Sequence, residues 1–66
     1  MPKSSITTIK AYMEDRYEVR LVQFESGGYR VLSQTITTEP VQTDLMFDYH
    51  LASIVFDAKC IELGMN

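Results

Sequence analysis

The chain of 66 residues contains a single cysteine, Cys60, and no tryptophan. One cysteine excludes an intramolecular disulfide, and no cysteine and histidine spacing resembles a zinc site. A domain of this size buries only about 60 % of the surface that its unfolded chain exposes, so small domains usually gain stability from disulfides, metals or oligomerisation. The sequence therefore predicts one domain over residues 1–66 that self-associates, with no metal and no cofactor.

The sequence also lacks a basic excess and a long apolar run. Six lysines and arginines against nine aspartates and glutamates give a net charge of −3, and the acidic residues are scattered. The strongly basic footprint of many nucleic-acid-binding proteins is thus absent. Asp48, His50, Asp57 and Lys59 interrupt the longest apolar-rich stretch, and no apolar signal sequence follows residues 1–5. We therefore expect a cytoplasmic protein that does not span a membrane.

Glycine and proline are few, three and two, and they mark the expected turns. Residues 5–13 and 17–25 are rich in β-branched, aromatic or alternating apolar side chains, which predicts two strands. Residues 26–28, Ser-Gly-Gly, are the strongest turn signal because glycine adopts the positive φ that hairpin turns need. Residues 29–36 form the third predicted strand, and Pro40 is expected to end the sheet because proline cannot donate to a ladder.

The C-terminal third, residues 43–63, predicts one helix. Thr43 or Asp44 is its expected N-cap, and Asp44 and Asp48 lie where the helix dipole favours anions. Gly64 is expected to end the helix in a left-handed conformation. The predicted fold class is α+β: a three-stranded antiparallel β-meander followed by one C-terminal α-helix packed on the sheet (β-β-β-α), as a dimer.

The predicted helix has two apolar stripes, whereas a small domain has only one core. One stripe contains Phe47, Leu51, Ile54, Ala58 and Ile61, with Val55 at its edge. The other contains Leu45, Tyr49, Ala52, Phe56, Cys60 and Leu63. A helix that is apolar on two sides lies between two packed layers, one being its own sheet and the other a second copy or another protein. We assign the interface to the Leu45–Leu63 stripe, with the outer sheet face as the alternative.

If both hairpin loops contain three residues, Met13 pairs with Tyr17 and Glu25 pairs with Tyr29. This register assigns the side chains of the strands to two faces. The core face then carries Ile9, Ala11, Met13, Tyr17, Val19, Leu21, Tyr29 and Val31. The outer face carries Ile6, Lys10, Tyr12, Glu18, Arg20, Val22, Phe24, Arg30, Leu32 and Ile36, which is more apolar than a bare solvent face needs.

One group of helix residues and the single cysteine could carry chemistry, and each has a simpler interpretation. His50, Ser53 and Asp57 share one helical stripe, but a serine inside a helix has no free backbone amides beside it for an oxyanion hole. We expect a solvated polar stripe. Cys60 is expected as a buried small hydrophobe, with no basic neighbour to activate its thiol. No catalytic or metal-binding residue is assigned; the remote alternative is an enzyme with an active site shared between protomers.

In the same register the outer sheet face brings Lys10, Tyr12, Arg20, Phe24 and Arg30 together. Basic and aromatic side chains on an open sheet are the ingredients of platforms for single-stranded nucleic acids. The two ribonucleoprotein motifs of such platforms are absent, and an acidic residue lies among the positive charges. Nucleic-acid binding through these five residues is therefore the alternative function.

The main prediction is a small non-enzymatic protein-interaction module, a homodimer that binds and modulates or inhibits another protein. The short chain, the lack of an assigned catalytic group and the surplus of apolar surface all favour it. Inhibitors and accessory proteins of phages and mobile elements are often of this size, which is an argument by analogy alone.

Overall fold

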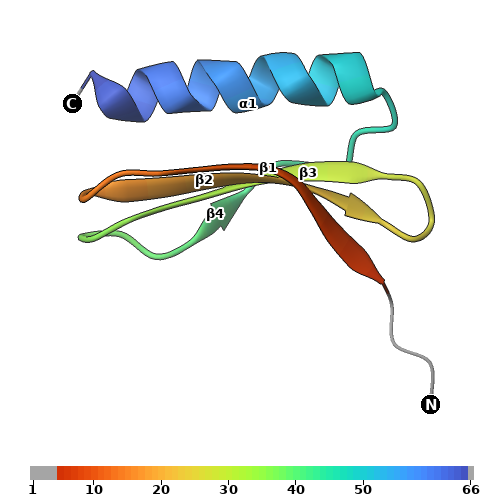
Figure 1. Ribbon diagram of the computed structural model, residues 1–66, viewed down its shortest axis with the longest axis horizontal. Coiled ribbons are helices and arrows are strands. Elements are labelled where there is room, and N and C mark those ends of the chain that lie inside the picture. Colours follow the sequence, from red (N-terminus) through yellow and green to blue (C-terminus); the bar gives the residue numbers. More distant parts are fainter. Residues whose placement is uncertain (1–4, 66) are drawn as a thin grey trace.

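The strands form one layer and the helix forms a second. The computed structural model describes residues 5–65. Its elements are β1 (Ile6–Met13), β2 (Tyr17–Phe24), β3 (Tyr29–Thr35), β4 (Val41–Gln42) and α1 (Tyr49–Gly64). The strands pair antiparallel in the order β1-β2-β3-β4. Figure 1 shows α1 lying across one face of the sheet, while no described element covers the other face. The α+β class with a C-terminal helix packed on an antiparallel sheet is confirmed.

A fourth strand extends the sheet beyond the predicted meander. Val41 pairs with Ser33 in β3, and the N–H of Thr43 donates to the carbonyl of Val31 at 3.1 Å. Further along, a bridge at Met46 continues this extended segment beside the start of β3. The prediction that Pro40 ends the sheet is wrong. Proline precedes an edge strand here, where a missing backbone donor costs no ladder bond.

The helix begins at Tyr49 and not at residue 43. Asp48 is its N-cap, and the Asp48 carboxylate accepts a hydrogen bond from the N–H of His50 at 3.1 Å. Thr43 cannot cap the helix because its hydroxyl oxygen accepts from the N–H of Val31 at 3.1 Å, which holds it beside the sheet. The predicted caps Thr43 and Asp44 are therefore wrong, and pairing with β3 is the reason.

The C-terminal end of the helix also differs from the prediction. Gly64 is still helical, and Met65 is the C-cap in a right-handed conformation, its N–H directed to the carbonyls of Ile61 and Leu63. The left-handed cap expected at Gly64 is wrong because these bonds close the helix without it. A side chain at this position would approach the sheet, since an added Cβ would lie 3.1 Å from the Tyr17 hydroxyl.

A β-bulge in β1 changes which side chains face the helix. The first residues keep the predicted register, with Ile6 opposite Phe24, but the register shifts between Thr8 and Lys10. Met13 therefore lies opposite Glu18 and not opposite Tyr17. A shift of one residue exchanges the two faces of a strand. In Figure 1 the start of β1 bends away from α1.

The shift moves four residues of β1 to the face opposite the predicted one. Lys10 and Tyr12 lie opposite Leu21 and Val19, on the helix side. Ala11 and Met13 lie opposite Arg20 and Glu18, on the outer side. Between β2 and β3 the register differs by two residues, with Gln23 opposite Tyr29, so every side chain there keeps its predicted face.

The core is small and comes from β2, β3 and α1. Its fully buried side chains are Val19, Leu21 and Val31 from the sheet and Ala52 from the helix, together with Phe56 at 7 % exposure. Partly buried hydrophobic side chains surround this cluster: Ile9, Tyr17, Tyr29, Met46, Val55, Cys60 and Leu63. The predicted core face is thus confirmed for Ile9 and for the residues of β2 and β3.

Candidate interaction surface

One apolar stripe of the helix is internal. Ala52 and Phe56 are buried against the sheet, and Cys60 and Leu63 pack against the same core. At the N-terminal end the ring of Tyr49 meets the ring of Tyr29 edge-on, with 5.8 Å between the centroids. The interface assignment of Ala52 and Phe56 is therefore wrong, because the single core of the chain already uses them.

Leu45, predicted on the same stripe, precedes the helix and lies with Phe24 and Arg30 on the outer side of the sheet. It lies over Gly28 at the end of the β2–β3 hairpin, where an added Cβ would be only 2.6 Å from the Leu45 Cδ1 atom. Leu45, Tyr49, Cys60 and Leu63 all keep some exposed surface. The prediction that they contact a partner is untested for these four. Cys60 and Leu63 border the core without being enclosed by it.

The opposite stripe of the helix is exposed. Leu51, Ile54 and Ile61 are 47 %, 53 % and 63 % exposed, and Ala58 between them is exposed as well. Four apolar side chains thus form one row along the side of α1 that faces away from the sheet. We call this row, Leu51, Ile54, Ala58 and Ile61, the outer helix stripe.

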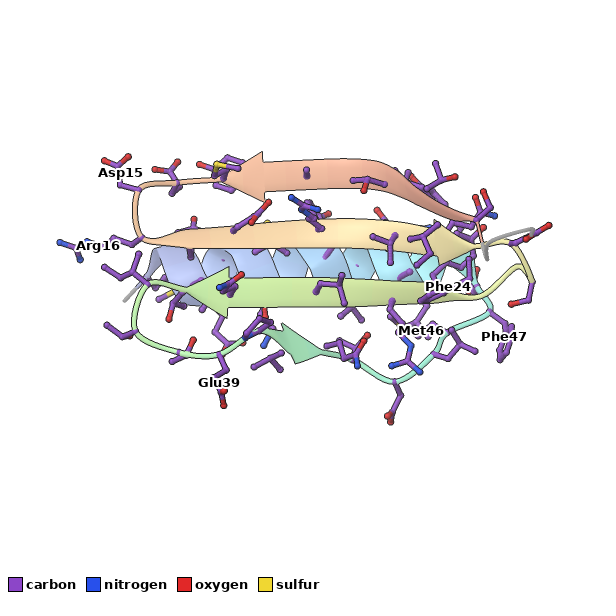
Figure 2. All side chains as sticks on the ribbon, turned by 90° about the horizontal axis from the view of Figure 1, so that it is seen from below. Asp15, Arg16, Phe24, Glu39, Met46 and Phe47 are labelled. Carbon is purple, nitrogen blue, oxygen red and sulfur yellow. The ribbon has the colours of Figure 1, made fainter. Side chains whose placement is uncertain are left out.

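The sequence pattern places Phe47 on this stripe, but in the structure Phe47 lies outside the helix. It precedes the N-cap, is 73 % exposed, and projects at the end of the molecule (Figure 2). Val55, predicted at the edge of the stripe, is partly buried against the core. The stripe is therefore shorter than the sequence pattern indicates.

Polar side chains border the outer helix stripe. Asp57 and His50 lie on one side of it, and Ser53 lies further toward the sheet, where its hydroxyl oxygen accepts a hydrogen bond from Lys10 Nζ at 2.8 Å. On the other side Lys59 Nζ lies 3.5 Å from a carboxylate oxygen of Glu62. The predicted polar stripe is thus tied to the sheet through Ser53.

Cys60 lies beside the core in a setting that disfavours its thiolate. Burial raises the pKa of the Cys60 thiol, the nearby carboxylate of Asp57 raises it further, and Lys10 opposes them with a smaller effect. A basic neighbour is therefore present although local sequence patterns did not indicate one, since the bulge in β1 brings Lys10 to the helix side.

The five residues proposed for nucleic-acid binding do not share one face. Lys10 bonds to Ser53 and lies 5.7 Å from the centre of the Phe56 ring, and Tyr12 contacts Tyr17 with 6.0 Å between ring centroids. Both are on the helix side because of the bulge. Arg20, Phe24 and Arg30 remain on the outer face.

Tyr12 has an acidic partner on the helix side. Its hydroxyl donates a hydrogen bond to the Glu14 carboxylate, and this bond, together with the charge of Glu14, raises the pKa of Tyr12 to about 12. An acidic neighbour of this kind is unfavourable for a phosphate contact. The platform expected from the sequence is thus reduced to its three outer members.

The outer sheet face combines charges with a hollow of mixed polar and apolar lining. Near the centre of this face, Arg20 Nε lies 2.7 Å from a carboxylate oxygen of Glu18, so the two charges neutralise each other. The Arg30 guanidinium lies 5.9 Å from the centre of the Phe24 ring, at one end of the sheet. A hollow of about 680 Å³ opens there, lined by Phe24, Glu25, Ser26, Arg30, Gln42 and Leu45. Figure 2 looks onto this face, with α1 behind the sheet.

Comparisons with protein-family models, with curated proteins and with solved structures gave no match. Within residues 5–65 no three His, Cys, Asp or Glu side chains are grouped as metal ligands would be. In the same residues no helix has the length and apolar character needed to cross a membrane. The surface features of the chain itself therefore carry the functional argument.

Proposed function

We propose that this chain is a non-enzymatic protein-interaction module that forms a homodimer and binds and modulates another protein. The observation that carries the proposal is the outer helix stripe. Its apolar side chains are held on the side of α1 opposite the core, so only another surface can remove them from water.

A comparison of free energies favours the outer helix stripe over the charged surfaces as the source of binding energy. Fully burying a Leu or Ile side chain contributes about 1.5–3 kcal/mol, so covering one that is half exposed contributes about 1 kcal/mol. An exposed ion pair such as Arg20 with Glu18 contributes about 0–1 kcal/mol and is screened by salt. Leu51, Ile54 and Ile61 together therefore outweigh the polar contacts at the surface.

A dimer formed through the helix leaves the opposite side of each copy available for a target. That side carries the hollow beside Phe24 and Arg30. Arginine and aromatic residues are enriched among the residues that dominate the energy of protein interfaces. Self-association and target binding would then use different faces of the domain. The comparison with inhibitors or accessory proteins of phages and mobile elements stays an analogy of size.

Sedimentation velocity of the chain at increasing concentration tests the self-association. The wild-type chain is expected to associate reversibly, and Ile54→Lys is expected to sediment as a monomer because it places a charge in the stripe. Ile36→Lys is the matched control, since Ile36 is 76 % exposed but lies outside the helix. A wild-type chain that stays monomeric at millimolar concentration would contradict the homodimer.

Target binding is tested with immobilised chain and an extract of the source organism. A specific partner is expected to be retained by the wild type and by Ile54→Lys, and lost with Phe24→Ser, since Phe24 lines the outer hollow. Circular dichroism of each variant shows whether the fold is intact. If Ile54→Lys fails to retain the partner and Phe24→Ser retains it, the target-binding site is on the helix instead.

A further inference from the structure

We infer that the outer helix stripe binds the same stripe of a second copy, with the two helices antiparallel. The inference rests on the proposed homodimer and specifies its geometry. A two-fold axis beside residue 56 of α1 places Ile54 against Ala58 of the partner subunit, and Leu51 against Ile61 of the partner subunit. Four apolar layers then form one seam between the two helices.

The spacing of the stripe is that of a helix–helix seam. Leu51, Ile54, Ala58 and Ile61 are separated by three, four and three residues, which is the a/d spacing of a heptad repeat. Two helices that meet along such a row pack at a small crossing angle, with side chains of one between side chains of the other. The row is therefore complementary to a copy of itself.

The sizes of the side chains favour the antiparallel orientation. In a parallel pair with the same seam, Ala58 would face Ala58 of the partner subunit and leave space, while two Ile54 side chains would crowd. In the antiparallel pair each Ile54 is opposite the small Ala58, so the layers have similar volumes, as close packing requires. Antiparallel helix dipoles are also the more favourable arrangement.

The sheet offers poorer surfaces for self-association. Edge strand β1 carries a bulge and Lys10, and edge strand β4 has two residues and follows Pro40. Bulges, lysine, proline and short length are the features by which proteins prevent edge-to-edge pairing. The outer face has the Arg20–Glu18 ion pair at its centre, and covering it with a second copy would remove both charges from water.

The area of the seam indicates a reversible dimer. A stable interface of standard size covers roughly 800 Å² on each partner, about one sixth of the 4932 Å² that this chain exposes. A single helix of 16 residues supplies less than that. We therefore expect monomer and dimer to exchange, with dimer favoured at high concentration.

Cysteine cross-linking tests the orientation, because the two seams bring different residues together. Each variant carries Cys60→Ala so that the native thiol does not react, and oxidised glutathione serves as the oxidant. An equimolar mixture of Ile54→Cys and Ala58→Cys chains is expected to give a mixed disulfide dimer, since residues 54 and 58 meet in the antiparallel seam. Each chain alone is expected to cross-link several-fold more slowly. Ile36→Cys in the same background measures random collision.

The possible results separate the inference from the proposed function. Fast cross-linking of Ile54→Cys with itself would show a parallel seam and overturn the inference. A second result would also overturn the inference: all samples cross-link at the Ile36→Cys rate while the Cys60→Ala chain is still dimeric in sedimentation. The homodimer would then stand, but its interface would lie elsewhere. A Cys60→Ala chain that is folded and monomeric throughout would overturn both.

Discussion

Phe56 and Ile54 are neighbours on one helix but belong to different environments. Phe56 is in the core, and Ile54 faces away from it. Phe56→Ala is expected to lower the free energy of unfolding by about 3–5 kcal/mol, through lost burial and the remaining cavity. That is most of the stability of a domain of this size, at roughly 0.05–0.15 kcal/mol per residue.

Ile54→Ala is the matched control for this measurement. Its cost is expected to stay below about 1 kcal/mol because an exposed side chain leaves no cavity. Urea denaturation followed by circular dichroism, at concentrations where the chain is monomeric, measures both values. Equal costs for the two variants would contradict the assignment of inner and outer stripes.

The Cys60 thiol is expected to react slowly with alkylating reagents. Its pKa is raised by burial and by Asp57, so less thiolate is present at a given pH than for a free cysteine, and the reaction rate at pH 8 should be lower than that of glutathione. Asp57→Asn removes one cause and should increase the rate. Reaction with iodoacetamide, followed by mass spectrometry, gives the comparison, and a rate above that of glutathione would contradict the buried setting.

At the scale of the element, the start of the helix is the feature most easily tested. Asp48→Ala is expected to lower the free energy of unfolding by about 1 kcal/mol because it removes the side-chain acceptor for the His50 N–H. Asp44→Ala is the control: it lies in the extended segment ahead of the helix and should have little effect. Thermal unfolding of both variants decides whether the helix begins after residue 48 or after residue 44.

Strong local signals made the three long strands and the presence of a C-terminal helix predictable. The Gly27 turn has a φ of 102°, as the glycine requirement of the hairpin implies, and alternation identified Val19, Leu21 and Val31 as core residues. These features depend on residues close together in the chain. The identity of the internal stripe could not be predicted in this way, because either apolar side of the helix could have packed on the sheet.

The bulge and β4 could not be predicted because long-range pairing determines them. The two residues of β4 follow a proline and are too few to give a strand signal, and they are extended because β3 offers a free edge. The bulge after Thr8 has no glycine to mark it, yet it moved Lys10 and Tyr12 across the sheet. Because the prediction did not include this extra residue, it assigned two members of the nucleic-acid face to the wrong side of the sheet.

At the scale of the whole molecule, charge is expected to oppose dimerisation. Each copy has a net charge of −3, so a dimer carries twice that value. In the proposed antiparallel seam Asp57, one residue from the two-fold axis, would also lie near Asp57 of the partner subunit. Raising the NaCl concentration should therefore strengthen the association, because salt screens repulsion between exposed charges.

Asp57→Asn should lower the dissociation constant about twofold, since a like-charge pair on a helix surface costs about 0.2–0.5 kcal/mol. Asp44→Asn changes the net charge equally but lies outside the helix, so it reports the effect of total charge alone. Sedimentation equilibrium at two salt concentrations measures all three chains. Weaker association at high salt would contradict the acidic seam.

The order of the strands in the sheet is the order in the chain, β1-β2-β3-β4, and the helix comes last. Each strand therefore finds its neighbour in the sheet already made, and only the helix must return across the sheet to pack on β2 and β3. Short-range topology of this kind is associated with fast folding. A helix of 16 residues is marginal alone, so it forms as it docks. Until then the sheet exposes Val19, Leu21 and Val31, and docking of the helix is the step that ends this exposure.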